Sequence, residues 1–193
     1  MRCALGGKLA ADVLGCQLAQ PAVNTNGVTK LRPAISRYIG LTRMHPVLCI
    51  ADTDGACASA LAEQWLPSRA PADFLLRFAV AESESWLLAD RESLAEYLQV
   101  PEARMPSNPD DEVDAKRVLL NLARRSRKRE IRAELVSQAD PSKPGTGYNA
   151  HLSSYVSRYW QPREAVARSP SLGRAIRRLE ALGKAASMIT RSA

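Results

Sequence analysis

Two short apolar runs, each followed at once by acidic residues, constrain this fold more than any other feature. Residues 47–51 form one uninterrupted apolar run, and residues 74–81, which are apolar apart from Arg77, form the second. Continuous runs of this length are typical of strands buried on both faces of a parallel sheet. The alanine-rich segment 56–65 between them is predicted to be a helix. A strand, a helix and a strand within about 35 residues predict a right-handed crossover unit.

Most of the remaining chain is predicted to be helical. Helices are expected at 9–18 and 28–39 before the first strand, and after the second strand at 84–89, 92–98, 113–123, 128–136, 148–159 and 172–182. The fold class is therefore α/β, with a small parallel sheet flanked by helices and a mainly helical C-terminal half. The expected division is an α/β core over residues 1–100 and a helical extension over residues 101–193.

Acidic residues follow both predicted strands. Asp52 and Asp54 come directly after the first run, and Glu82 and Glu84 follow the second. Because ligands of open α/β sheets bind at the carboxyl ends of the strands, these side chains are expected to meet at one edge. Neighbouring carboxylates repel one another unless a cation lies between them, and hard oxygen ligands suit Mg²⁺ or Mn²⁺. The alternative is that Asp52 and Asp54 cap the next helix and shape the turn at Gly55.

The net charge of +7 comes from one segment. Between Lys116 and Arg132, eight basic residues stand against the single acid Glu130, so the rest of the chain is neutral. Dense like charges usually serve a partner, and guanidinium groups match the geometry of phosphates. We interpret the segment as a contact for nucleic-acid phosphates, whereas the alternative is a solvated helical face balanced by the acidic residues of 110–114. The predicted contact residues are Lys116, Arg117, Arg124, Arg125, Arg127, Lys128 and Arg129.

A longer stretch resembles a known fold. The sequence RFAVAESESWLLAD at residues 77–90, with the segments 147–149 and 169–172, is similar to an uncharacterised bacterial family of Toprim-like proteins. Toprim domains are the metal-dependent catalytic domains of topoisomerases, primases and overcoming-lysogenization-type nucleases. The resemblance implies a parallel-sheet core, a magnesium site and phosphodiester chemistry. Because genes of the family often lie beside ATPase genes in mobile or defence loci, it also implies an ATPase partner and a role in bacterial antiviral defence.

The N-terminal region departs from the Toprim pattern. A Toprim site takes a glutamate and a glycine after its first strand, and its DxD pair follows a later strand. Here the corresponding stretch, CALGGKL at residues 3–9, has no acid before Asp12, and Gly6 stands where the glutamate is expected. A truncated chain, a misassigned start and a degenerate site are the alternatives, and each would weaken or abolish nuclease activity. Asp52, Asp54 and Glu84 remain the catalytic candidates, with Glu82 as a further metal ligand.

Three functions follow from these patterns. The leading hypothesis is a Mg²⁺-dependent phosphodiesterase or nuclease that acts on nucleic acid. The second is a degenerate, non-catalytic Toprim-like module that binds nucleic acid or an ATPase. The third is a helical interaction protein whose acidic residues are only turn caps.

The cysteines indicate the redox environment of the protein, and the spacing of the cysteines and histidines predicts no metal site. The four cysteines form no CxxC pair and fit a reducing, cytoplasmic environment, with Cys57 expected to be buried. His45 and His151 show no ligand spacing, so a zinc site is not expected. The chain has no apolar run long enough to span a membrane, and no membrane partner is expected.

Overall fold

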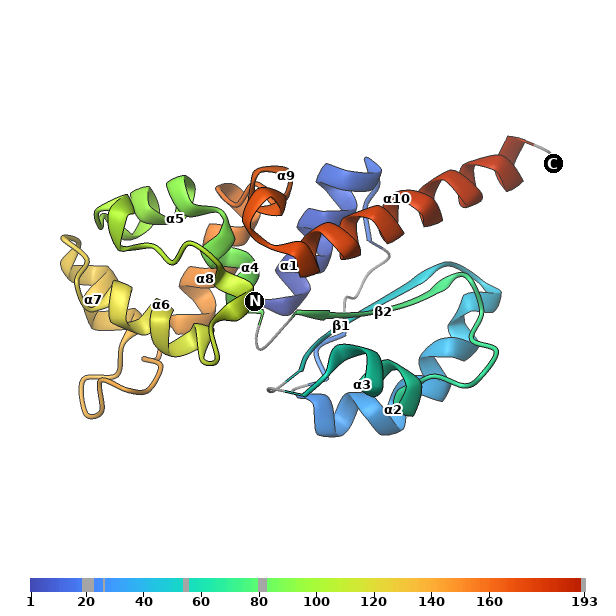
Figure 1. Ribbon diagram of the computed structural model, residues 1–193, viewed down its shortest axis with the longest axis horizontal. Helices are drawn as coiled ribbons and strands as arrows, with labels where there is room; N and C mark the ends of the chain where they lie inside the picture. Colours follow the sequence, from blue (N-terminus) through green and yellow to red (C-terminus); the bar gives the residue numbers. More distant parts are fainter. Residues whose placement is uncertain (19–22, 26, 54–55, 80–82, 192–193) are drawn as a thin grey trace.

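A two-stranded parallel sheet flanked by helices, followed by a mainly helical C-terminal half, makes up this α/β chain (Figure 1). This arrangement is seen in a computed structural model that describes residues 1–193 apart from 19–22, 26, 54–55, 80–82 and 192–193. The expected fold class is confirmed.

The sheet is formed by β1 (Val47–Asp52) and β2 (Phe74–Ala79). The strands are parallel, with Val47 opposite Phe74 and Asp52 opposite Ala79. Helix α3 (Ala58–Trp65) connects them, as the spacing of the apolar runs predicts. Because the strands run in the same direction in register, their carboxyl ends lie side by side.

Alternate residues of each strand enter two separate apolar clusters, one on each face of the sheet. Cys49 and Phe78 pack with α2 (Val28–Gly40) and α3 on one face. Leu48 and Leu75 belong to the larger cluster on the other face. In Figure 1, α2 and α3 lie below the strands, whereas α1 and α10 lie above them. Both faces are therefore covered, which explains why the strands read as continuous apolar runs.

The N-terminal segment differs from the expectation. A helix was expected at 9–18, and the Toprim pattern places a first strand before Gly6, but α1 (Arg2–Leu9) begins at once and continues as a π-helical turn to Leu14. Leu5 and Leu9 lie on one side of α1 and are buried in the larger cluster, which stabilises the helix. Gly15 ends it in the left-handed conformation, with φ of 63°.

The helical half wraps around the larger cluster, which runs from Leu5 to Leu179 and so includes residues on both sides of residue 100. Trp86 and Trp160 lie at its centre and are fully buried. The helices after β2 are α4 (Glu84–Ala89), α5 (Arg91–Leu98), α6 (Ala115–Ala123), α7 (Arg129–Leu135), α8 (Tyr148–Arg158), α9 (Pro162–Ala165) and α10 (Pro170–Arg191).

Candidate functional site

The carboxyl ends of the two strands bring two of the predicted acids together. Asp52 is the last residue of β1, and Glu84 is the first residue of α4. Asp52 Oδ1 accepts a hydrogen bond of 2.9 Å from the Ser83 backbone N–H. The Ser83 hydroxyl donates a hydrogen bond of 3.3 Å to Glu84 Oε2. Two acids from separate segments therefore contact the same serine, at the sheet edge where the sequence predicts them.

A tyrosine from the helical half completes this group. Tyr148, the first residue of α8, donates a hydrogen bond of 2.8 Å from its hydroxyl to Glu84 Oε1. Asp52, Glu84 and Tyr148 are only 5%, 3% and 4% exposed. We call Asp52, Ser83, Glu84 and Tyr148 the buried acid group. It joins the end of the sheet to α8.

The donor chemistry of the buried acid group fits a hard divalent cation. Carboxylate oxygens are the ligands that Mg²⁺ and Mn²⁺ prefer. Because both carboxylates already accept hydrogen bonds from the protein, an ion would share or replace some of these bonds. The other two predicted acids, Asp54 and Glu82, lie outside the residues that the structure describes.

The segment that carries the Toprim resemblance also holds the helices together. The Trp86 indole N–H donates a hydrogen bond of 2.7 Å to the Ser171 hydroxyl at the start of α10. The Trp160 indole N–H donates one of 3.1 Å to the Trp86 backbone oxygen. Both tryptophans are fully buried and so act as packing anchors.

Asp90, the last residue of the resembling segment, is a further buried carboxylate. Its Oδ2 accepts a hydrogen bond of 2.7 Å from the Gln161 backbone N–H and one of 3.3 Å from the Tyr155 hydroxyl. Burial raises the pKa of Asp90, against the opposing effect of these hydrogen bonds. Burial likewise raises the pKa of Tyr155. Asp90 thus fixes the beginning of α9 relative to α4.

The predicted phosphate contacts form an exposed turn between α6 and α7. Arg124 and Arg125 follow α6, Arg127 and Lys128 lie in the connection, and Arg129 begins α7. All five side chains are exposed. We call these five residues the basic segment. In Figure 1, α6 and α7, which flank this segment, lie on the side of the molecule away from the two strands.

The basic segment makes few contacts with the rest of the protein. Lys128 Nζ lies 3.4 Å from the Tyr97 backbone oxygen and 5.7 Å from the centre of the Tyr97 ring. Within the described ranges, no ion pair joins any of the four arginines to an acidic side chain. The positive charge of the segment is therefore directed to solvent.

The acidic residues before α6 have other partners. Asp110 accepts hydrogen bonds from Ser169 and Ser171 at the start of α10. Asp114 caps α6 through a bond of 2.7 Å from the Arg117 N–H, and its carboxylate lies 3.7 Å from the Arg117 guanidinium. Of the predicted phosphate contacts, Arg117 is therefore paired with an acid. Lys116, the remaining predicted contact, is only partly exposed.

The glycine-rich loop 143–147 connects two helices. The Gly145 N–H donates to the Leu135 carbonyl at 2.8 Å, and the Gly147 N–H donates to the Glu134 carbonyl at 3.0 Å. These donors satisfy carbonyls at the end of α7. The loop is therefore a connecting turn whose backbone donors bind the end of α7.

The expectation for Cys57 is wrong, because this thiol is exposed. Cys57 precedes the first turn of α3, a helix with no buried residue, and its hydrogen bond with Ser59 lowers the pKa of the thiol. Cys49 inside β1 is the buried cysteine, and burial raises its pKa to about 11.

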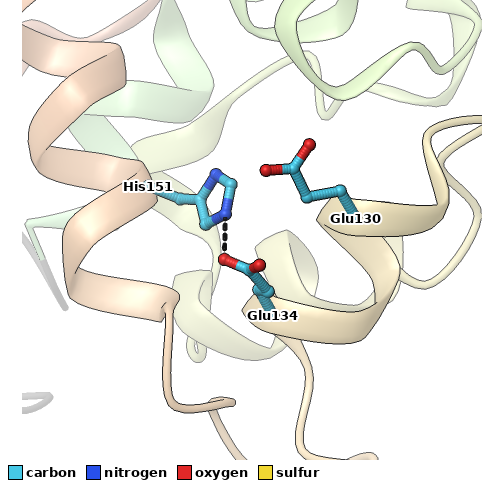
Figure 2. Close-up of side chains that lie close together, drawn as sticks. All are labelled: Glu130, Glu134 and His151. Carbon is cyan, nitrogen blue, oxygen red and sulfur yellow. Dashed lines mark hydrogen bonds and ion pairs between the residues drawn. The ribbon is translucent and has the colours of Figure 1, made fainter.

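A second group of titratable side chains was not foreseen. Glu130 and Glu134 of α7 and His151 of α8 have potential ligand atoms that all lie within 4.8 Å of one another (Figure 2). We call these three residues the Glu–Glu–His group. In the sequence His151 looks isolated, because the two glutamates that lie beside it in the structure belong to another helix. The available signal was the spacing of Glu130 and Glu134, which places both on one face of a helix.

Comparisons with protein-family models, curated proteins and solved structures give no match to this chain. The resemblance to Toprim-like proteins therefore stays a prediction. Among the residues placed by the structure, no helix is both long enough and apolar enough to cross a membrane.

Proposed function

We propose that this chain binds nucleic acid through the basic segment. The observation that supports the proposal is the exposure of Arg124, Arg125, Arg127, Lys128 and Arg129 on one turn, with no ion pair to an acidic side chain in the described parts of the chain. A surface arginine or lysine that forms no ion pair does not have to break one before it binds a phosphate.

The physical basis of such binding is the exchange of counterions. Each phosphate neutralised by Lys or Arg releases condensed cations, and log K falls with log salt by about 0.9 per contact on duplex DNA. Arginine adds two parallel hydrogen bonds to one phosphate, which lysine does not. Binding is therefore expected to weaken steeply with salt and to depend little on sequence.

The test is charge reversal with a matched control. The double variant Arg124→Glu/Arg125→Glu is expected to bind duplex DNA, single-stranded DNA and RNA at least about tenfold more weakly and to show a shallower salt dependence. Arg32→Glu/Arg37→Glu reverses two exposed arginines on α2 and should change the affinity less than about twofold. Equal losses in the two double variants, or no salt-sensitive binding by the wild type, would contradict the proposal.

A second candidate function is divalent-ion-dependent cleavage of phosphodiesters. It is favoured by the meeting of Asp52 and Glu84 at Ser83, beyond the carboxyl ends of parallel strands. These carboxylates would hold Mg²⁺ or Mn²⁺, and such an ion supplies charge neutralisation on the scissile phosphate. In this arrangement Tyr148 orients Glu84 through its hydroxyl.

Cleavage is tested on plasmid and single-stranded DNA with Mg²⁺ or Mn²⁺. Asp52→Asn keeps the shape of the side chain but removes its charge, and it should abolish cleavage. Asp111→Asn, at an exposed position before α6, should leave the rate unchanged. Equal cleavage by the wild type and Asp52→Asn would eliminate this candidate.

The non-catalytic alternative is favoured by α1. A helix occupies residues 2–9, where the Toprim pattern requires a strand that ends in glutamate. Binding of nucleic acid or of an ATPase, without cleavage, is the outcome that would favour this module over the enzyme.

A further inference from the structure

Three side chains from two helices converge at the surface beside the basic segment. Glu130 and Glu134 lie one turn apart on α7, and His151 lies on α8. The distance between His151 Nε2 and Glu134 Oε2 is 2.8 Å. Figure 2 shows the Glu130 carboxylate directed toward the imidazole from the other side. The side chain of His151 is 16% exposed and that of Glu134 is 49% exposed, so solvent reaches the group.

We propose that the Glu–Glu–His group binds a divalent transition metal, with Zn²⁺ as the best-fitting ion. One imidazole and two carboxylates are a ligand set that zinc accepts, at about 2.0–2.2 Å per bond. Ligand atoms at tetrahedral angles around such an ion lie roughly 3.4 Å apart. The distance of 2.8 Å between His151 Nε2 and Glu134 Oε2, and the limit of 4.8 Å within which all the ligand atoms lie, are compatible with this value. Small side-chain rotations therefore suffice, and a water molecule takes the fourth position.

A hydroxyl behind His151 holds the imidazole in the orientation that a metal needs. The Tyr97 hydroxyl lies 3.1 Å from His151 Nδ1 and donates a hydrogen bond of 3.2 Å to the His151 backbone oxygen. With its hydrogen directed to that carbonyl, the tyrosine oxygen accepts a bond from Nδ1–H. Such a partner on one ring nitrogen leaves the lone pair of Nε2 for a metal, as is usual behind metal-binding histidines.

A glycine makes the room that the ligands occupy. A Cβ atom at Gly147 would lie 2.8 Å from Glu134 Cβ, 2.9 Å from Glu134 Oε2 and 3.2 Å from His151 Cδ2. Any larger residue would therefore displace Glu134 away from the imidazole. The Gly147 N–H also donates a hydrogen bond of 3.0 Å to the Glu134 backbone carbonyl. This bond fixes the end of α7 against the start of α8.

The competing explanation is an ordinary ion pair between protonated His151 and Glu134. Such a pair does not need Glu130 and gives no affinity for zinc. The two explanations therefore differ in whether zinc binds and in whether Glu130 contributes to that binding.

The experiment is calorimetric titration of the untagged full chain with Zn²⁺ alone. The titration uses the Cys16→Ser/Cys57→Ser background, which removes the two exposed thiols as alternative zinc ligands. One zinc ion is expected to bind per chain. Glu134→Gln and His151→Gln should each lower the affinity by about 100-fold or more, and Tyr97→Phe by about tenfold. Glu130→Gln should also weaken binding, whereas Glu63→Gln, an exposed glutamate on α3, should not.

Circular dichroism of each variant without metal tests whether the variant folds. Two further variants test where the ion binds. Asp111→Asn, at an exposed position before α6, should bind zinc as the background protein does. Gly147→Ala keeps every ligand but should weaken binding. The absence of zinc binding by the background protein, or equal affinity in His151→Gln and Glu63→Gln, would overturn the proposal. Unchanged affinity in Glu130→Gln would remove Glu130 from the ligand set and would also overturn the proposal.

Discussion

The buried acid group and the Glu–Glu–His group both contact α8, and they differ in their access to solvent. Glu84 is almost fully buried, and Tyr148 and Ser83 donate hydrogen bonds to it. Glu134 is half exposed and accepts its contact from His151 at the surface. Buried hydrogen-bonded carboxylates are expensive to disturb, whereas exposed ones contribute little to stability. The buried acid group therefore stabilises the fold, whereas the Glu–Glu–His group is accessible to a ligand from solvent.

The largest expected effect comes from removing a carboxylate of the buried acid group. Glu84→Ala deprives the Tyr148 hydroxyl of this acceptor and should lower the free energy of unfolding by about 2–4 kcal/mol. Glu130→Ala, at an exposed position, should change it by less than about 0.5 kcal/mol. Urea denaturation of both variants measures the difference. Similar losses in the two variants would show that the distinction between the groups is wrong.

A smaller effect is expected from Gly147, where α8 begins against Glu134. Gly147→Ala places a methyl group 2.8 Å from Glu134 Cβ, and such overpacking should cost about 1–3 kcal/mol. Gly7→Ala is the matched control, because a Cβ at Gly7 inside α1 meets nothing within 4 Å. That control should stabilise the protein by about 0.5–1 kcal/mol through its helix propensity. A stabilising Gly147→Ala substitution would mean that α7 and α8 are less closely packed than the structure shows.

The smallest expected effect is a change in the pH dependence of stability at Asp90. Because burial raises the pKa of Asp90 above its ordinary value of 3.8, the folded protein binds this proton more tightly than the unfolded chain does. The resulting stabilisation is complete below the ordinary pKa and is lost as the pH rises through the raised value. Asp90→Asn does not titrate, so the stability of the wild type relative to this variant should fall from acidic to neutral pH. Urea denaturation across that range measures the trend, and a rise toward neutral pH would contradict it.

The strands and helices could be predicted because the sequence patterns that indicate them lie within each segment. The strands at 47–52 and 74–79 lie inside or within one residue of the predicted apolar runs. A helix was predicted at 172–182, and α10 begins at Pro170, where the Ser169 hydroxyl accepts a hydrogen bond from the Leu172 N–H. The proximity of Asp52 to Glu84 also followed from the rule for parallel strands.

The sequence-based predictions fail where contacts between segments far apart in the sequence determine the structure. Nothing local distinguishes a first strand from the helix α1, whose stability depends on burying Leu5 and Leu9 against other helices. The partners of His151 come from α7, so no spacing along the chain places them together. The bound ion expected at Asp52 and Glu84, and the catalysis expected from it, stay predictions.

Helix α8 carries Tyr148 and His151 only one turn apart, and each side chain reaches a different set of carboxylates. A displacement of α8 as a whole would therefore move Tyr148 at the sheet edge together with His151 at the surface.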